Sequence, residues 1–351
     1  MSRSYRIIVA APQVPFLRGG AELHAELTVA ALVEAGHEAE LVTVPYTWTG
    51  TVSSLEQAMA WRLVNFEETA PGEVDLLIAT KYPAYLARHR NKVAWIFHQQ
   101  REVYDLHPTP FGNFRLADDE MGLRDALVEL DMEALSENRA LFTNSQNTAN
   151  RLQMYCGVEA TPLYAPPPLH QRLTVGDYGD YLFFLGRLDR IKRLDLTIQA
   201  LASTRNPVRL RVAGRGPDLD RLEGLVTELG LEDRVDFLGF AADADVLELM
   251  AGCFAMVLTP LDEDYGFTTL EAFFAGRPIV TTTDAGGVLE FVREGETGFV
   301  VDPDPVALAE RIDLLYEDRA LCERLGHEGR EMVQDRVSWP KAIAALTATL
   351  E

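Results

Sequence analysis

The stretch Thr259-Pro-Leu-Asp-Glu-Asp-Tyr-Gly-Phe-Thr-Thr-Leu-Glu-Ala-Phe-Phe-Ala-Gly-Arg-Pro278 carries the strongest structural signal in the chain. Its order predicts a strand that ends at Pro260, an acidic loop around Gly266, and a short helix that begins near Thr268 and ends at Gly276. In open α/β sheets, ligands bind beyond the carboxyl ends of the strands. The acidic loop is therefore a candidate binding site.

Two interpretations of the short helix are open. Thr268 and Glu271 have the spacing of a capping box, in which the glutamate side chain returns to the first amides of the helix. Alternatively, the amides at the helix start present a positive end to a phosphate, while Glu263 and Glu271 accept hydrogen bonds from sugar hydroxyls. The first interpretation gives Glu271 a role in stability, and the second gives it a role in binding.

Apolar runs alternate with helical stretches on both sides of this segment, which is typical of parallel α/β sheets. Residues 161–168 interrupt the alternation with three consecutive prolines, which cannot continue a helix. We expect a hinge there, between two α/β domains that face each other across a cleft. The expected strands are residues 7–12, 38–44, 75–79, 93–97 and 140–144 before the hinge, and 181–186, 208–214, 235–239, 255–260, 278–282 and 298–301 after it.

Composition excludes several classes of protein. The 351 residues are 47% hydrophobic, which suits a globular protein of roughly two or three domains, and the net charge of -22 excludes a general nucleic-acid-binding protein. Three scattered cysteines and the lack of a long apolar run predict a cytoplasmic protein. Asp-x-Asp pairs arise readily in so acidic a chain, so we assign no metal site.

Glu263, seven intervening residues and Glu271 resemble the Glu-x7-Glu signature of the retaining nucleotide-sugar glycosyltransferases of family 4, which have the GT-B fold. The resemblance implies that Glu263 contacts the donor sugar and that Glu271 contacts the donor ribose. It also implies that one backbone segment lies near the sugar and the diphosphate, formed by Gly266, Phe267, Thr268, Thr269 and Leu270.

Further matches follow in the order that the family shows. Gly186-Arg-Leu-Asp-Arg-Ile-Lys-Arg193 resembles the segment in which Arg187 and Lys192 would neutralise the donor diphosphate. The alternative is a solvated basic turn, because Asp189 can pair with either cation. Gly214 and Leu238 lie in segments that resemble those lining the base side of the nucleotide.

Two N-terminal matches concern the other domain. Gly19 and Gly20 resemble the family's glycine loop, which approaches the donor phosphates, although an ordinary turn before a helix is an alternative. His98 follows an apolar strand, where the family carries a histidine near the donor sugar and the acceptor. A structural histidine is the alternative there.

One local charge pattern departs from the acidic average. Residues 76–101 contain no Asp or Glu, whereas residues 81–101, the basic stretch, contain Lys81, Arg88, Arg90, Lys92 and Arg101. Three interpretations are open: this stretch meets an anionic acceptor, makes weak peripheral contact with anionic lipid, or is a solvated face beside the acidic residues 118–137. Contact with lipid would place the cytoplasmic protein at the inner face of the membrane.

The resemblance leads to a specific expectation. The GT-B fold would consist of two Rossmann-like domains: residues 1–165 on the acceptor side, together with a C-terminal helix at about 337–351, and residues 166–336 binding the nucleotide sugar. The expected reaction transfers a sugar from a nucleotide diphosphate sugar to an acceptor hydroxyl with retention, using Glu263, His98, Arg187 and Lys192 and no metal or other cofactor. A nucleotide-sugar epimerase, a phosphorylase and a non-catalytic nucleotide-sugar-binding subunit are the alternatives.

Overall fold

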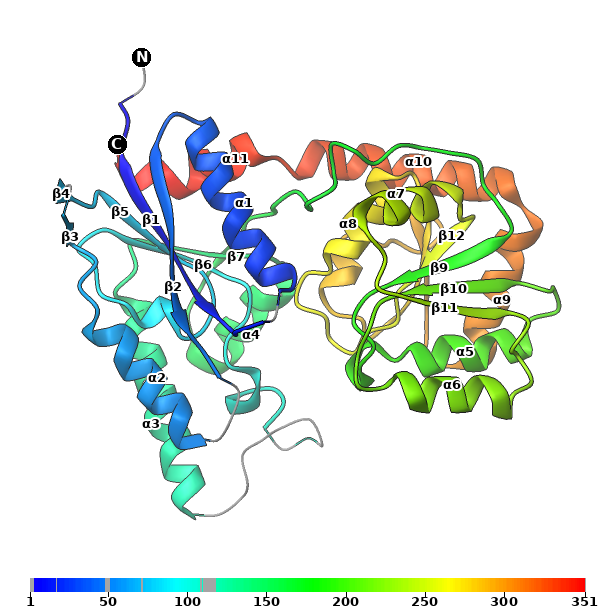
Figure 1. Cartoon of the computed structure of the whole chain (residues 1–351), viewed down its shortest axis with the longest axis horizontal. Coiled ribbons are helices and arrows are strands. Elements are labelled where there is room, and N and C mark those ends of the chain that lie inside the picture. Colours follow the sequence, from blue (N-terminus) through cyan, green and yellow to red (C-terminus); the bar gives the residue numbers. More distant parts are fainter. Residues whose placement is uncertain are drawn as a thin grey trace. The chain divides into compact units, whose positions relative to one another are not determined.

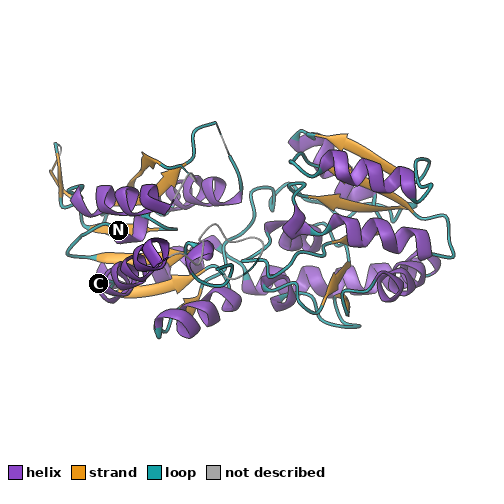
Figure 2. Cartoon of the chain, turned by 90° about the horizontal axis from the view of Figure 1, so that it is seen from below, coloured by secondary structure: helices purple, strands orange, loops and turns teal. Residues whose placement is uncertain are grey.

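The structure is a computed structural model that describes residues 3–16, 18–47, 51–70, 72–107, 109 and 118–350, of which residues 51–53 and 118–119 are described by their backbone alone. The chain divides into two compact units (Figure 1). The N-terminal unit comprises Met1–Pro168 and Ser338–Glu351, and the C-terminal unit comprises Leu169–Val337. In each unit, helices cover both faces of a sheet (Figure 2).

The N-terminal unit contains a six-stranded parallel sheet in the order β2-β1-β5-β6-β7-β8. Its strands are β1 (Arg6–Gln13), β2 (Glu38–Pro45), β5 (Leu76–Ala79), β6 (Lys92–Ile96), β7 (Ala140–Thr143) and β8 (Thr161–Pro162). Its helices are α1 (Gly20–Glu34), α2 (Thr51–Leu63), α3 (Asp118–Ser136), α4 (Gln146–Cys156) and α11 (Trp339–Thr347). A two-stranded hairpin, β3 (Glu68–Thr69) and β4 (Gly72–Glu73), was not expected from the sequence.

The central strands β1, β5 and β6 are buried on both faces, which explains why they are almost continuously apolar. Ile7 and Val9 of β1 pack in one core with α1 and α11, whereas Ile8 and Ala10 pack in a second core with α2, α3 and α4. Trp339, at the start of α11, lies 6.2 Å from Trp95 between ring centroids. The C-terminal helix is therefore part of the N-terminal core.

The C-terminal unit contains a second six-stranded parallel sheet, in the order β11-β10-β9-β12-β13-β14. Its strands are β9 (Tyr181–Leu185), β10 (Arg209–Ala213), β11 (Val235–Gly239), β12 (Ala255–Val257), β13 (Ile279–Thr282) and β14 (Gly298–Val301). Its helices are α5 (Leu194–Ser203), α6 (Leu219–Glu228), α7 (Asp243–Gly252), α8 (Phe267–Phe274), α9 (Pro305–Glu317) and α10 (Arg319–Arg336). Every apolar run expected to form a strand does so in one of the two units.

Strand order also locates the point in each sheet where a ligand is expected. The chain moves outward from β9 to one side and then returns to β12 on the other, so the order reverses between β9 and β12. In the N-terminal sheet the order reverses between β1 and β5. Such reversals open a crevice at the carboxyl ends of the two strands, where ligands of α/β proteins bind.

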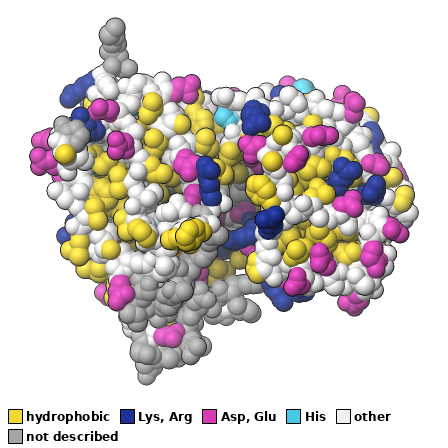
Figure 3. Space-filling view, viewed as in Figure 1, with side chains coloured by type: hydrophobic (Ala, Val, Ile, Leu, Met, Phe, Trp, Pro, Cys, Tyr) yellow, Lys and Arg dark blue, Asp and Glu magenta, His cyan; other side chains and the backbone are white. Residues whose placement is uncertain are grey.

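All five cations of the basic stretch contact carboxylates. The pairs are Lys81 with Glu22 (2.7 Å), Arg88 with Glu133 (3.7 Å), Arg90 with Glu73 (2.8 Å), Lys92 with Glu137 (3.1 Å) and Arg101 with Asp105 (2.6 Å). On the face shown in Figure 3, basic side chains are interspersed with acidic ones. Because the partners come from elsewhere in the chain, an acid-free stretch of sequence does not form an unpaired cationic surface.

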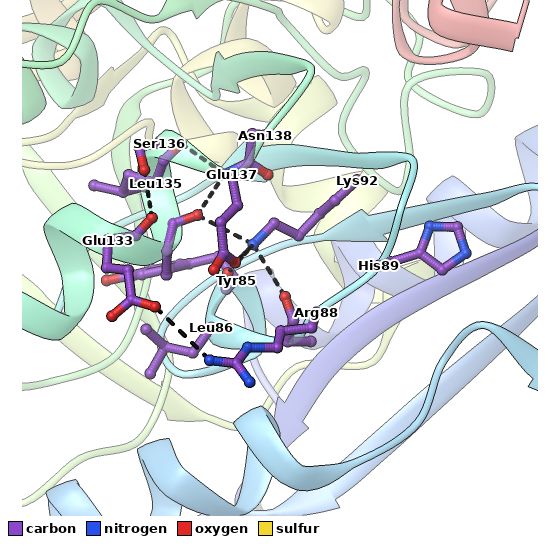
Figure 4. A network of polar contacts seen from close by, with 12 residues as sticks. Tyr85, Leu86, Arg88, His89, Lys92, Glu133, Leu135, Ser136, Glu137 and Asn138 are labelled. Atoms are coloured by element: carbon purple, nitrogen blue, oxygen red, sulfur yellow. Dashed lines mark hydrogen bonds and ion pairs between the residues drawn. The ribbon is translucent and has the colours of Figure 1, made fainter.

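Lys92 is the most deeply buried of these cations. Its side chain is fully buried, and its Nζ donates to the carbonyls of Tyr85 (3.1 Å), Ala87 (3.0 Å) and Ala134 (3.1 Å) as well as to Glu137. Figure 4 shows this network around Lys92. A buried ammonium that holds three carbonyls joins the ends of neighbouring elements, so Lys92 has a structural role.

Candidate active site

The loops that follow β9, β10 and β11 are joined backbone to backbone. Gly186 donates its amide to the carbonyl of Ala213 (3.1 Å), and Gly214 donates to Gly239 (2.7 Å). Gly214 has a φ of 149°, and a Cβ there would lie 1.8 Å from the carbonyl oxygen of Gly186. Gly214 thus permits the close approach of these loops, while its own amide already has an acceptor.

The two predicted diphosphate cations lie beyond the carboxyl end of β9. The Nε of Arg187 donates to Asp189 at 2.5 Å, and the Arg187 side chain is 64% exposed. Asp189 also accepts from the amide of Lys192 (3.2 Å), which holds the short 3₁₀ helix η3 (Arg190–Lys192). Asp189 therefore pairs with Arg187, and Lys192 directs its ammonium elsewhere.

The Nζ of Lys192 contacts the carboxylate of Glu263. Glu263 follows β12, the strand across the reversal from β9, so the pair spans the crevice between these two strands. The backbone of Glu263 is fixed because its amide donates to Ala285 (3.1 Å) and its carbonyl accepts from Gly287 (2.7 Å). The structure thus brings together two side chains that lie 71 residues apart in sequence.

Helix α8 begins one residue earlier than the sequence predicted. Its N-cap is Gly266, with φ 75° and ψ 72°, and Phe267 is the first helical residue. Thr268 is consequently inside the helix rather than at its N-cap, so the capping-box interpretation of Glu271 is wrong. The left-handed conformation at Gly266 is one that glycine adopts readily.

The other predicted residues of this segment differ in what they can offer a ligand. The amide of Thr269 donates to the carbonyl of Gly266 (2.9 Å), and the Thr268 hydroxyl lies 3.4 Å from the carbonyl of Leu185. The Thr269 hydroxyl is buried and has no partner in the described part of the chain. Leu270 is fully buried, and its amide lies beyond the four that an α-helix leaves without intrahelical acceptors.

Glu271 is a buried carboxyl group, 7% exposed, that makes no hydrogen bond or ion pair with any described residue. Burial, with a smaller contribution from the charge of Asp243, raises its pKa from 4.5 to about 7. A buried carboxylate without a partner is costly. The group is therefore suited to accept hydrogen bonds from a hydroxyl-bearing ligand rather than to stabilise the fold.

Leu238, the residue predicted near the base, is 43% exposed in β11. Phe240, two residues later, is 71% exposed, with the Arg215 guanidinium 5.8 Å from its ring centroid. Both residues flank Gly239, whose carbonyl accepts the amide of Gly214, so they lie next to the loop that follows β10. Both side chains are therefore accessible to a ligand at this end of β11.

In the N-terminal unit, the predicted glycine loop caps α1. Gly19 is the N-cap residue, and its amide donates to Glu22 (2.9 Å). Glu22 also binds Lys81 (2.7 Å), which lies just beyond β5, and both side chains are about nine-tenths buried. Burial acts to raise the pKa of Glu22, but Lys81 and the Gly19 amide outweigh it, so the pKa is lowered. Gly20 is the first residue of α1.

The Glu22–Lys81 pair is a feature of the site region that the sequence analysis missed. It lies at the reversal between β1 and β5, as Lys192–Glu263 lies at the reversal between β9 and β12. The signal was present in the sequence, because Glu22 lies in the glycine-loop motif and Lys81 follows an apolar strand. Glu22 and Lys81 meet because β1 and β5 are paired in the sheet, and this pairing is not evident from the sequence.

His98 lies two residues beyond the carboxyl end of β6, as expected. Its Nδ1 is 2.7 Å from the carbonyl oxygen of Gln99. A carbonyl only accepts, so Nδ1 is the donor in this contact. His98 and the glycine loop belong to the N-terminal unit, whereas the other predicted site residues belong to the C-terminal unit.

Within the described ranges, no group of three His, Cys, Asp or Glu residues has the arrangement of a metal site, and no helix is long and apolar enough to cross a membrane. A cavity of about 470 Å³ lies beside Gly276, at the opposite end of α8 from Gly266. It contains none of the predicted site residues. Its other lining residues include Val175, Tyr178, Glu323, His327 and Arg330.

Solved structures share the architecture of the whole chain. Sucrose-phosphate synthase from Thermosynechococcus elongatus superposes with a TM-score of 0.77 over 98% of each chain at 19% identity. Anabaena HepE, solved in complex with UDP and glucose, superposes with a TM-score of 0.73 over 99% of each chain at 20% identity. With its two parallel six-stranded sheets, the chain has the expected GT-B fold.

Sequence comparison finds relatives that share similarity with about half of this chain. N-acetyl-alpha-D-glucosaminyl L-malate synthase of Bacillus anthracis is 31% identical over 179 residues, which are 50% of this chain and 46% of that protein. The chain spans less than half the length of this and two other curated relatives with about 30% identity. The sequence profile of the glycosyl transferases group 1 matches residues 169–332, nearly all of the unit that holds Arg187, Lys192, Glu263 and Glu271. The C-terminal unit is therefore similar to the glycosyl transferases group 1.

Proposed function

We propose that the protein is a retaining glycosyltransferase that moves a sugar from a nucleotide diphosphate sugar to an acceptor hydroxyl. The observation that carries the proposal is the Lys192–Glu263 contact at the strand reversal, with Arg187 and the start of α8 on the same edge of the sheet. UDP in the HepE structure and the sugar-transferring names of the relatives support a nucleotide-sugar donor.

The cations have a direct role in this proposal. Breaking the bond between the sugar and the diphosphate leaves negative charge on the departing phosphate oxygen. Arg187 and Lys192 stabilise that charge, assisted by the positive end of α8, and fixed charges of this kind lower such barriers substantially. On donor binding, the Lys192 ammonium exchanges the Glu263 carboxylate for a phosphate oxygen. Glu263 is then available to accept hydrogen bonds from the sugar.

The other residues bind and orient the substrates. Glu271 accepts hydrogen bonds from the ribose hydroxyls, and the two short segments around Gly214 and around Leu238 lie beside the base. Gly19, Gly20 and His98 act from the N-terminal unit, which supplies the acceptor side. The departing phosphate assists the attack of the acceptor hydroxyl on the same face of the sugar, which retains configuration. Because the protein supplies two cations to the diphosphate, the proposal requires neither a metal nor another cofactor.

The test is a donor screen with the purified full chain. Nucleotide diphosphate sugars with different bases and sugars are incubated with and without hydroxyl acceptors, and the release of free nucleotide diphosphate is followed. We expect release that depends on the acceptor, with a glycosylated product of retained configuration by NMR. Sugar isomerisation without nucleotide release identifies an epimerase, release that depends on inorganic phosphate identifies a phosphorylase, and donor binding without turnover identifies a binding subunit.

A further inference from the structure

Arg193, directly after Lys192, is the most extensively hydrogen-bonded arginine of the candidate site. Its backbone has φ 48° and ψ 41°, in the left-handed region that residues other than glycine rarely adopt. Its guanidinium lies within hydrogen-bond distance of five acceptor atoms, three of which share Nη2. The acceptors are the carbonyls of Thr259 (2.9 Å) and Pro260 (3.0 Å), the Thr282 hydroxyl (2.9 Å), and the two carboxylate oxygens of Asp284 (2.8 and 2.5 Å).

These acceptors belong to two different loops of the site. Thr259 and Pro260 lead from β12 toward Glu263, whereas Thr282 and Asp284 end β13 and begin the loop that pairs with Glu263. Arg193 itself closes the segment that carries Lys192. One guanidinium therefore connects the support of the cation Lys192 to the support of the carboxylate Glu263.

Backbone hydrogen bonds continue the same connection. Leu261 donates its amide to the carbonyl of Ile191 (2.8 Å), on the Lys192 side, and Asp262 donates to the carbonyl of Asp284 (2.9 Å). Both bonds lie within a few residues of the Arg193 contacts. If the guanidinium is removed, these backbone bonds and the Glu263 backbone contacts are left to hold the short loops against each other.

Asp284 keeps the guanidinium in this position. Burial acts to raise the pKa of Asp284, but the hydrogen bonds from Arg193 and Thr282 outweigh it and lower the pKa. The paired oxygens of Asp284 face the two terminal nitrogens of Arg193, a bidentate arrangement that fixes direction as well as distance. Lysine in place of Arg193 has no planar fork and cannot reach all the acceptors.

We propose that Arg193, held by Asp284, is a positioning residue that sets the geometry of Lys192 relative to Glu263 for sugar transfer. The proposal rests on the proposed function, because it assigns Lys192 to the diphosphate and Glu263 to the sugar. Arg193 touches neither substrate group in this scheme. It acts by keeping the two loops at a fixed separation, and small displacements of reacting groups reduce rates strongly.

Amide hydrogen exchange tests the positioning directly and needs no substrate. The main variant is Arg193→Gly, because glycine adopts the left-handed backbone freely and only the guanidinium is lost. We expect the amides of Leu261, Asp262, Glu263 and Gly287 to exchange at least about tenfold faster, while those of β10 keep their parent rates. The matched control is Arg209→Gln, which removes an exposed arginine that pairs with Asp236 (3.3 Å) at the other end of β10.

A second variant and a second measurement separate positioning from general loss of structure. Asp284→Asn keeps the size of the side chain and should accelerate the same amides by a smaller factor. In the transfer assay, we expect Arg193→Gly to lower kcat about 10- to 100-fold with a smaller change in KM, and Arg193→Lys to recover part of it. Circular dichroism monitors folding of every variant.

The outcomes distinguish the two proposals. Parent-like exchange of the four amides in both Arg193→Gly and Asp284→Asn overturns the positioning role. Faster exchange limited to these amides supports it, even if the parent protein turns over no nucleotide sugar, a result that counts against the proposed function alone. Uniformly faster exchange throughout the C-terminal unit in both variants overturns the positioning role and makes Arg193 a general stabilising residue.

Discussion

Each unit places a lysine–glutamate pair at the strand reversal of its own sheet, yet the two pairs differ in burial and in their neighbours. Lys81 and Glu22 are 10% and 11% exposed, and Glu22 also accepts the amide of Gly19. Lys192 and Glu263 are 24% and 18% exposed, and Arg187 and the start of α8 lie on the same edge. The first pair is committed to holding α1 against β5. The second is accessible enough to exchange its internal contact for a ligand.

This difference shows that the position and environment of a cation, and not the charge of the surrounding sequence, decide whether it is available to a ligand. The basic stretch looked conspicuous because residues 76–101 contain no acid, but its cations all contact carboxylates. Arg187 and Lys192 lie in a segment with an acidic residue between them. They also contact carboxylates, Asp189 and Glu263, but they lie at the strand reversal of the C-terminal unit and are more exposed than Lys81. The contrast between the two units can be tested in four ways.

The largest effect is expected from removing the cations of the C-terminal unit. The double substitution of Arg187 and Lys192 by Ala should lower kcat/KM at least about a thousandfold, because both stabilise charge on the departing diphosphate. The free energy of unfolding, from urea titration, should change by less than about 1 kcal/mol, since these side chains are partly exposed. Arg209→Ala is the control for loss of a surface arginine. A double variant with a near-parent rate contradicts the assignment.

For the Lys81–Glu22 pair of the N-terminal unit, we expect the main effect on stability and not on activity. Lys81→Met leaves the Glu22 carboxylate buried beside an apolar side chain, and the free energy of unfolding should fall by about 3 kcal/mol. Adding Glu22→Gln should restore part of this loss, because a neutral amide still accepts from Gly19 without leaving a buried charge. If Lys81→Met instead keeps the parent stability and loses transfer activity, the Lys81–Glu22 pair takes part in the reaction. The two lysine–glutamate pairs would then not differ in role.

A smaller effect concerns the pH dependence of Glu271. The folded protein holds this proton up to about pH 7, whereas the ordinary carboxyl releases it near 4.5, so the free energy of unfolding should fall between these pH values and level off above them. A carboxylate accepts hydroxyl hydrogen bonds better than a protonated acid. Donor affinity by calorimetry should therefore rise about tenfold from pH 6 to pH 8.

Glu271→Gln is the control for this pH dependence. It keeps the shape of the side chain and an acceptor oxygen but has no proton to lose in this range. We expect weak donor affinity with no slope between pH 6 and pH 8. The same slope in parent and variant would show that another group, and not Glu271, controls binding.

The smallest effect is expected on the exposed part of the basic stretch. Arg88 and Arg90 pair with Glu133 and Glu73, and each of these four side chains is at least half exposed. Replacing both arginines with Gln should leave the urea midpoint of unfolding close to that of the parent. Flotation with phosphatidylserine vesicles should be equally weak for parent and variant. Vesicle binding that the substitutions abolish would restore the lipid interpretation of this stretch.

Much of the fold could be predicted because its signals are local. A parallel strand buried on both faces is an unbroken apolar run, and Ile7 to Ala11 or Tyr181 to Leu185 are recognisable without knowledge of their neighbours. The hairpin of β3 and β4 escaped detection because strands of two residues have no periodicity. The start of α8 was misplaced because Thr268 fits the capping pattern, whereas the actual N-cap, Gly266, has no side chain to announce it.

Sequence alone determined the alternation of strands and helices, the glutamates at 263 and 271, and the cations at 187 and 192, since these depend on residue type and spacing. Tertiary structure decided which charges meet. The Lys192 ammonium contacts Glu263 rather than Asp189, and Lys81 pairs with Glu22. Arg193 contacts two loops that are distant in sequence. These contacts arise because the order of strands in a sheet, and not their order in the chain, sets which strand ends are neighbours.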